Sequence, residues 1–193
     1  ELQVIAVGPL TNLAITLGKY PQIKPLLKRI LIMGGSAVKG NTTPAAEFNI
    51  YADPHAAQLV FKSGVPIVMC GLDVTMSAYL TPEEVADLGQ NDSPVCRFFH
   101  ESTKLPLAFL ERGGQQTGLC LHDACPVVFL THPQLFQGQE AGVFVETQST
   151  FCNGKTVTDL WSDKKFPMKN TFVVLDVDRP AFVDLVQKLM LSY

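Results

Sequence analysis

Short apolar runs recur along this chain, and each one ends at a glycine or a polar turn. The runs lie at residues 4–7, 29–33, 66–70 and 171–177, with helix-like stretches between them. Short apolar runs that alternate with helical patterns are typical of buried strands in an α/β fold. We therefore expect one domain, residues 1–193, built on a mainly parallel open sheet flanked by helices. Ligands of such sheets bind beyond the carboxyl ends of the strands.

Start signals for helices follow several of these runs. Thr11 or Asn12 can cap one helix, and Asp53 before a proline marks the start of another. Thr81 and Glu84 have the spacing of a capping box. Further helices are expected at residues 93–112, 125–130 and 180–191, and a small antiparallel addition at residues 142–163 around an Asn-Gly turn.

Composition and charge argue against two classes of partner. The chain is 47% hydrophobic and 17% charged, with a formal net charge of −3, so no basic surplus indicates nucleic acid. No apolar run approaches the roughly 20 residues that span a bilayer, so we expect no membrane partner. The five cysteines include no close CxxC pair, and an odd number favours a reduced, cytoplasmic protein over a disulfide framework.

A carboxylate and a carboxamide, Glu47 and Asn49, stand two positions apart just ahead of a helix start. In an extended segment, alternation would place them on one side and Phe48 and Ile50 on the other. Glu47 offers acceptors only, whereas Asn49 offers donors and an acceptor. Such a pair suits a ligand rich in hydroxyl groups, such as a sugar. The alternative interpretation is a polar edge before the helix.

The dipeptide His122-Asp123 lies where a loop meets a helix. In one interpretation Asp123 caps that helix and His122 is a half-buried spacer. In the functional interpretation Asp123 is a hard oxygen ligand for a divalent cation, and His122 is a neutral or cationic partner near a leaving group. Cys120 and Cys125 flank the pair and could suggest a thiolate metal site, although structural zinc normally has four well-spaced ligands. Asp73 is expected to end a strand and cap its turn.

Two motifs carry the most specific signal, GPLTNLA at residues 8–14 and EFNIYADP at residues 47–54. Their companions are IMGG at residues 32–35, GN at 40–41, GLDVT at 71–75 and LHDA at 121–124. Taken together, these motifs resemble the inosine–uridine preferring nucleoside hydrolase family. Their order and spacing fit that family from one end of the chain to the other.

The resemblance implies a nucleoside-hydrolase-like fold and hydrolysis of the N-glycosidic bond of ribonucleosides to ribose and free base. It also implies a tightly bound Ca²⁺ ion that holds the ribose hydroxyls and a water. Matched by position, Asp123 and the backbone carbonyl of Val7 would bind calcium. The matching substrate residues are Asn41, Glu47 and Asn49 for the ribose hydroxyls, Met33 for the sugar pocket and His122 for departure of the base.

One departure from the family pattern is serious. The DxDxGxDD signature, which supplies most calcium-binding carboxylates and the catalytic base, occurs nowhere in this chain. The resemblance covers the C-terminal two-thirds of the pattern, so we expect a domain that is incomplete at its N-terminus. A truncation and a short paralogue that has lost catalysis are both open. In either case, this chain alone is expected not to hydrolyse nucleosides.

The alternative function is a non-catalytic ribose- or nucleoside-binding module, and a third is a structural partner that completes an oligomer. We expect a homo-oligomer, either a dimer or a tetramer. Base preference in the family depends on the region that corresponds to residues 109–118, where Gln115 and Gln116 are the obvious hydrogen-bonding side chains. A purine, pyrimidine or broad preference stays open.

Overall fold

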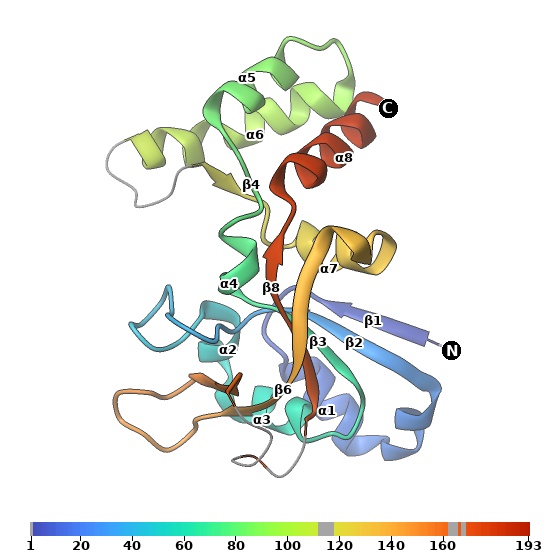
Figure 1. The fold of residues 1–193 in the computed structure, drawn as a ribbon, viewed down its shortest axis with the longest axis vertical. Coiled ribbons are helices and arrows are strands. Elements are labelled where there is room, and N and C mark those ends of the chain that lie inside the picture. Colours follow the sequence, from blue (N-terminus) through green and yellow to red (C-terminus); the bar gives the residue numbers. More distant parts are fainter. Residues whose placement is uncertain (1, 112–117, 162–165, 167–168) are drawn as a thin grey trace.

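Strands and helices alternate along most of the chain in the computed structural model, which describes residues 2–111, 118–161, 166 and 169–193 (Figure 1). The strands are β1 (Leu2–Ala6), β2 (Leu27–Met33), β3 (Ile67–Cys70), β4 (Tyr79–Leu80), β5 (Leu119–Cys120), β6 (Phe136–Val145), β7 (Thr156–Asp159) and β8 (Thr171–Val177). The α-helices are α1 (Thr11–Lys19), α2 (Phe48–Ala52), α3 (Pro54–Phe61), α4 (Leu72–Thr75), α5 (Pro82–Gly89), α6 (Pro94–Glu111), α7 (Ala124–Thr131) and α8 (Arg179–Leu191). Short 3₁₀ helices, η1 (Pro21–Leu26) and η2 (Pro133–Leu135), precede β2 and β6.

The main sheet has the strand order β1-β2-β3-β8-β6-β7. The pairings from β1 through β2 and β3 to β8 are parallel, whereas β6 pairs antiparallel with both β8 and β7. The predicted fold class, a mainly parallel sheet with a small antiparallel addition, is therefore confirmed. Because β1, β2 and β3 run in the same direction, their carboxyl ends share one edge of the sheet.

Helices cover both faces of the sheet around β2, as the burial of its side chains shows. Ile30 and Ile32 pack into a core with α1 and α3, while Leu31 between them packs into a second core with α7. All three side chains are fully buried. Burial on both faces explains why β2 reads as a continuous apolar run and not as an alternating one.

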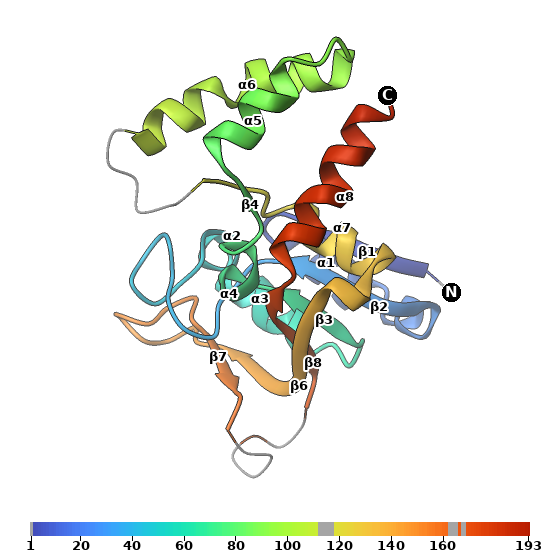
Figure 2. The same cartoon turned by 45° about the horizontal axis from the view of Figure 1, so that its top comes forward.

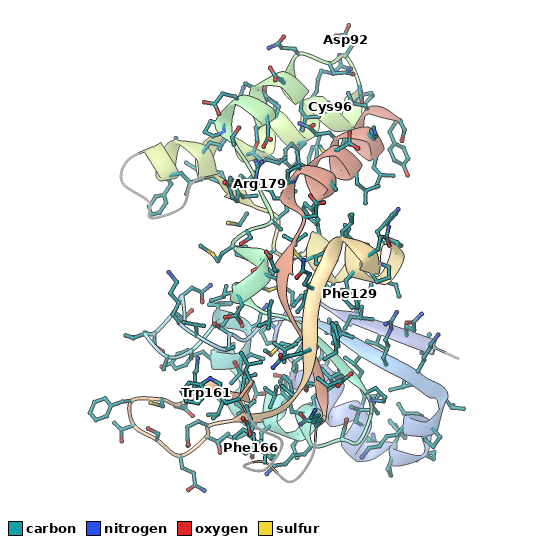
Figure 3. All side chains as sticks on the ribbon, viewed as in Figure 1. Asp92, Cys96, Phe129, Trp161, Phe166 and Arg179 are labelled. Atoms are coloured by element: carbon teal, nitrogen blue, oxygen red, sulfur yellow. The ribbon has the colours of Figure 1, made fainter. Side chains whose placement is uncertain are left out.

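Helices α5, α6 and α8 lie together at one end of the molecule (Figures 1 and 2), and their buried side chains join the same core as Leu31, Val68 and Val174 of the sheet. The predicted capping box is present at the start of α5, where Thr81 and Glu84 bond each other's backbone N–H groups. Arg179 at the base of α8 (Figure 3) donates to Glu84 at 2.6 Å, and its guanidinium lies 4.2 Å from the centre of the Tyr79 ring. One arginine therefore joins α8 to the first turn of α5 and to β4 before it.

The structure corrects the predicted cap of α1. The helix begins at Thr11 and follows Leu10, which has no side chain that could cap it. The Thr11 hydroxyl donates instead to Asp53 at 2.6 Å. Asp53 also accepts from the Ala56 N–H and starts α3, as predicted. The Thr11 and Ala56 hydrogen bonds lower the pKa of the Asp53 carboxyl below its usual value. The Thr11 hydroxyl is thus bonded to Asp53, 42 positions away, and does not cap its own helix.

No described helix is both long enough and apolar enough to cross a bilayer. The five cysteines are all free thiols, and Cys70, Cys96 and Cys125 are buried.

Candidate functional site

The residues singled out from the sequence gather at the carboxyl ends of β1, β2 and β3 and at the turn after β5. Val7 follows β1, Met33 ends β2, and α2 and α4 lie at the same edge of the sheet (Figure 1). This edge is where parallel sheets bind ligands.

Glu47 is a buried cap, which corrects the expectation of an extended segment. The helix α2 starts at Phe48, and the Glu47 carboxylate accepts hydrogen bonds from the N–H groups of Asn49 at 2.8 Å and Ile50 at 3.2 Å. A third bond, at 2.9 Å, comes from the N–H of Gly35 just after β2. A carboxylate has about four acceptor positions, so these bonds leave roughly one for a ligand.

Asn49 connects the ends of two neighbouring strands. Its side-chain amide donates to the backbone oxygen of Met33 at 3.2 Å and lies 3.5 Å from the backbone oxygen of Val7. The same amide lies 3.4 Å from the Met33 sulfur. The side-chain oxygen of Asn49 accepts no hydrogen bond from the described residues and is available to a ligand. Asn49 is therefore oriented by the protein and keeps one polar group free.

Asn41 lies in a tight loop that leads into α2. Its side-chain oxygen accepts a hydrogen bond from the Phe48 N–H at 3.0 Å. The loop closes on itself because the N–H groups of Asn41 and Thr42 both point to the Ala46 carbonyl, each at 3.2 Å. A side chain at Gly40 would come within 2.2 Å of that carbonyl, so the loop requires glycine there. The amide N–H groups of Asn41 donate to nothing among the described residues.

His122 makes no hydrogen bond to these side chains among the described residues, and it is held by a residue that the sequence did not reveal. Its Nδ1 is 2.8 Å from the hydroxyl of Thr75, which ends α4 and is fully buried. Burial lowers the pKa of His122 below its usual value, and the Asp123 charge opposes that shift in part. The imidazole is therefore disposed to be neutral near pH 7.

Asp123 precedes α7 but does not cap it through its side chain. The residue has helical backbone angles, its side chain is exposed, and it makes no cap hydrogen bond. The carboxylate also has no hydrogen-bonding partner elsewhere in the described part of the chain. The simple capping role is therefore wrong, and the carboxylate oxygens are free to bind a cation.

The cysteines beside this dipeptide do not support a thiolate metal site. Burial raises the pKa of Cys120 to about 11 and that of Cys125 to about 12, so both are thiols near pH 7. Cys125 lies 3.6 Å from the Leu121 carbonyl, to which its thiol can donate. Across the described residues, no group of three or more acidic, histidine or cysteine side chains could hold a metal ion.

Sequence reasoning missed the contacts that fix the loop after β2. The Thr156 hydroxyl accepts from the Ser36 N–H at 2.8 Å and donates to the Ser36 carbonyl at 2.7 Å. Lys155 donates to the Ser36 and Val38 carbonyls, and burial lowers its pKa. Asp73 belongs to α4 and accepts from the loop at Ala37 and Val38, so it anchors a neighbouring segment and does not cap its own turn. The contacts of Thr156 and Lys155 join residues more than 100 positions apart, so no local sequence motif predicts them.

We predict that Thr156→Val destabilises the protein, because the Ser36 N–H loses its buried acceptor. The expected loss is about 1–3 kcal/mol in the free energy of unfolding, measured by denaturant titration. Thr158→Val is the matched control on the same strand, because the single hydrogen bond of the Thr158 hydroxyl among the described residues goes to the nearby Thr156 carbonyl. Equal losses in the two variants would show that Thr156 does not anchor the loop.

The sequence matches the family described as inosine-uridine preferring nucleoside hydrolase over residues 1–184. The non-specific ribonucleoside hydrolase RihC of Escherichia coli O1:K1 / APEC is 43% identical over 187 residues, and RihC of Shigella boydii serotype 18 shows the same identity. Each match covers 97% of this chain and 60% of the relative. The chain thus spans about 60% of the length of these curated relatives.

Solved nucleoside hydrolases share the fold. The plant nucleoside hydrolase PpNRh1 superimposes with a TM-score of 0.91 at 29% identity, covering 100% of this chain and 63% of that one. The purine-preferring ribonucleoside hydrolase from Gardnerella vaginalis gives a TM-score of 0.89 at 30% identity, covering 99% of this chain and 60% of that one. With the family match extending over nearly the whole sequence, the chain belongs to the inosine-uridine preferring nucleoside hydrolase family.

Proposed function

We propose that the protein containing this chain hydrolyses the N-glycosidic bond of ribonucleosides to ribose and free base, with Ca²⁺ as its cofactor. The observation that carries this proposal is the position of Asn49. Its amide lies against the Met33 and Val7 carbonyls, and its oxygen is left free at the ligand-binding edge of the sheet. The relatives named ribonucleoside hydrolases support the same reaction.

The free polar groups suit the hydroxyls of a ribose. The Asn49 side-chain oxygen can accept a hydrogen bond, the Asn41 amide can donate, and Glu47 keeps roughly one acceptor position. Ribose hydroxyls both donate and accept, so they match all of these groups. The buried negative charge of Glu47 would also stabilise positive charge that builds on the sugar ring as the base departs.

The oxygen donors of this chain fit a hard cation such as Ca²⁺. Asp123 offers an exposed carboxylate with no hydrogen bond from the described residues, and Val7 offers a backbone carbonyl. Because Ca²⁺ takes about six to eight oxygen ligands, these donors cover part of its coordination. We infer that other ligands come from water, from the sugar hydroxyls and from protein outside this chain. A bound ion would supply a Lewis acid that makes water more acidic and aligns the sugar.

His122 is the residue that we assign to the departing base. A neutral imidazole can donate a hydrogen bond to a base that gains negative charge, and so ease the breaking of the glycosidic bond. The residues expected to set base preference, Gln115 and Gln116, lie outside the described residues. We also propose that the protein is cytoplasmic and forms a homo-oligomer, either a dimer or a tetramer.

The direct test measures release of hypoxanthine from inosine and of uracil from uridine. We expect the complete protein to release base in the presence of Ca²⁺ and to lose this activity after exhaustive chelation, with recovery when Ca²⁺ is restored. The 193-residue chain alone should release none. Activity that survives chelation would contradict the calcium assignment, and a complete protein without activity would contradict the function.

Asn41→Asp tests the ribose-binding role without removing a structural contact. Aspartate keeps the oxygen that accepts from the Phe48 N–H and loses the amide donors. We expect kcat/KM to fall by roughly 10- to 100-fold, the cost of about one or two hydrogen bonds. Asn91→Asp is the matched control, because the Asn91 oxygen also accepts a backbone N–H, from Ser93, in an exposed turn.

The role of Asn41 is judged by comparing the stability and the kcat/KM of Asn41→Asp with those of Asn91→Asp. Unchanged stability with reduced kcat/KM in Asn41→Asp alone supports the assignment. Wild-type kcat/KM in Asn41→Asp would show that its amide does not bind the substrate.

A further inference from the structure

Thr75 carries a fully buried hydroxyl with a single hydrogen-bonding partner in the described part of the chain. It is the last residue of α4, and its Oγ lies 2.8 Å from Nδ1 of His122. Nothing in the pattern of the sequence marks this pair, because the residues lie 47 positions apart.

The position of the pair is fixed from both sides. On one side, the Thr75 N–H donates at 3.0 Å to the carbonyl of Gly71, the residue just before α4. On the other side, the Leu121 N–H donates to the Ala78 carbonyl at 2.8 Å, next to the antiparallel pairing of Tyr79 with Cys120. These backbone hydrogen bonds therefore fix the segments that carry Thr75 and His122 relative to each other.

The donors and acceptors available to Thr75 and His122 decide which of the two groups donates the proton in this hydrogen bond. A hydroxyl has one proton to donate, and a buried donor without an acceptor is costly. If Nδ1 of His122 carried the ring proton, Thr75 would accept that proton and its own O–H would have no acceptor among the described residues. If Nδ1 is bare, the Thr75 O–H donates to it and both groups are satisfied.

We propose that Thr75 is a positioning residue that donates to Nδ1 and so holds neutral His122 with its proton on Nε2. The bond thereby gives His122 an N–H donor on the ring nitrogen that Thr75 does not contact. This inference rests on the proposed function, in which His122 assists departure of the base. As the glycosidic bond breaks, its electron pair passes to the base, and the Nε2–H hydrogen bond disperses the charge without proton transfer.

The ring nitrogens of His122 provide a test that does not require activity. Long-range ¹H–¹⁵N correlation of the complete protein, at a pH where imidazoles are neutral, reports which nitrogen carries the proton. His122→Gln identifies the signals by their loss. We expect the Nε2–H form in the wild type and in Thr75→Ser, and a mixture of the two forms in Thr75→Val. A proton on Nδ1 in the wild type, or an unchanged Thr75→Val, would overturn the proposal.

Kinetics give a second readout that a merely structural role would not move. Thr75→Val should lower kcat for inosine by roughly tenfold or more, within the range of a positioned hydrogen-bonding group, with little change in KM. A ribosyl 4-nitrophenol substrate should keep its kcat, because 4-nitrophenolate departs without a donor. Thr75→Ser should restore most of the inosine activity.

Different results would contradict the role of Thr75 and the proposed hydrolase function on which that role rests. Equal losses on both substrates, or no loss on either, would contradict the role of Thr75. A wild-type protein that hydrolyses neither substrate would contradict the proposed function, and the ring-nitrogen measurement would still decide the form of His122.

Discussion

The buried carboxylate of Glu47 is the interaction on which the arrangement of the site depends. It accepts hydrogen bonds from the N–H groups of Asn49 and Ile50 at the start of α2 and from that of Gly35 just after β2. A five-residue helix has little stability of its own, so its start must be fixed by such bonds. Because Glu47 fixes α2 against the sheet, Asn49 reaches the carbonyls of two strands.

The backbone at Gly35 also connects Glu47 with the helix that holds His122. The Gly35 carbonyl accepts a hydrogen bond from Leu72 at the start of α4, at 2.9 Å, and α4 ends at the threonine that holds His122. A side chain at Gly71 would approach the Gly35 carbonyl to 2.7 Å, so this junction requires glycine. Glu47 and the histidine are thus joined through backbone contacts, although they share no hydrogen bond in the described residues.

Local patterns were sufficient to locate strands of the sheet and the start of one helix. Apolar runs identified β2, β3 and β8, and Asp53 before a proline identified α3. The prediction of an extended segment was wrong at Glu47. A helix cap and the end of a strand have similar local sequences, and Gly35, which donates to the Glu47 carboxylate, lies 12 positions away. Thr75 and Thr156 escaped notice for a related reason: each acts on a residue distant in the sequence, at 47 and 120 positions.

We infer that the Glu47 carboxylate holds the site together, and one substitution tests this role most directly. Glu47→Gln keeps the shape and replaces one accepting oxygen with a donor that faces backbone N–H groups. The measurement is the free energy of unfolding by denaturant titration. We predict that the free energy of unfolding falls by about 2–3 kcal/mol, the cost of unsatisfied buried donors. A variant as stable as the wild type would contradict it.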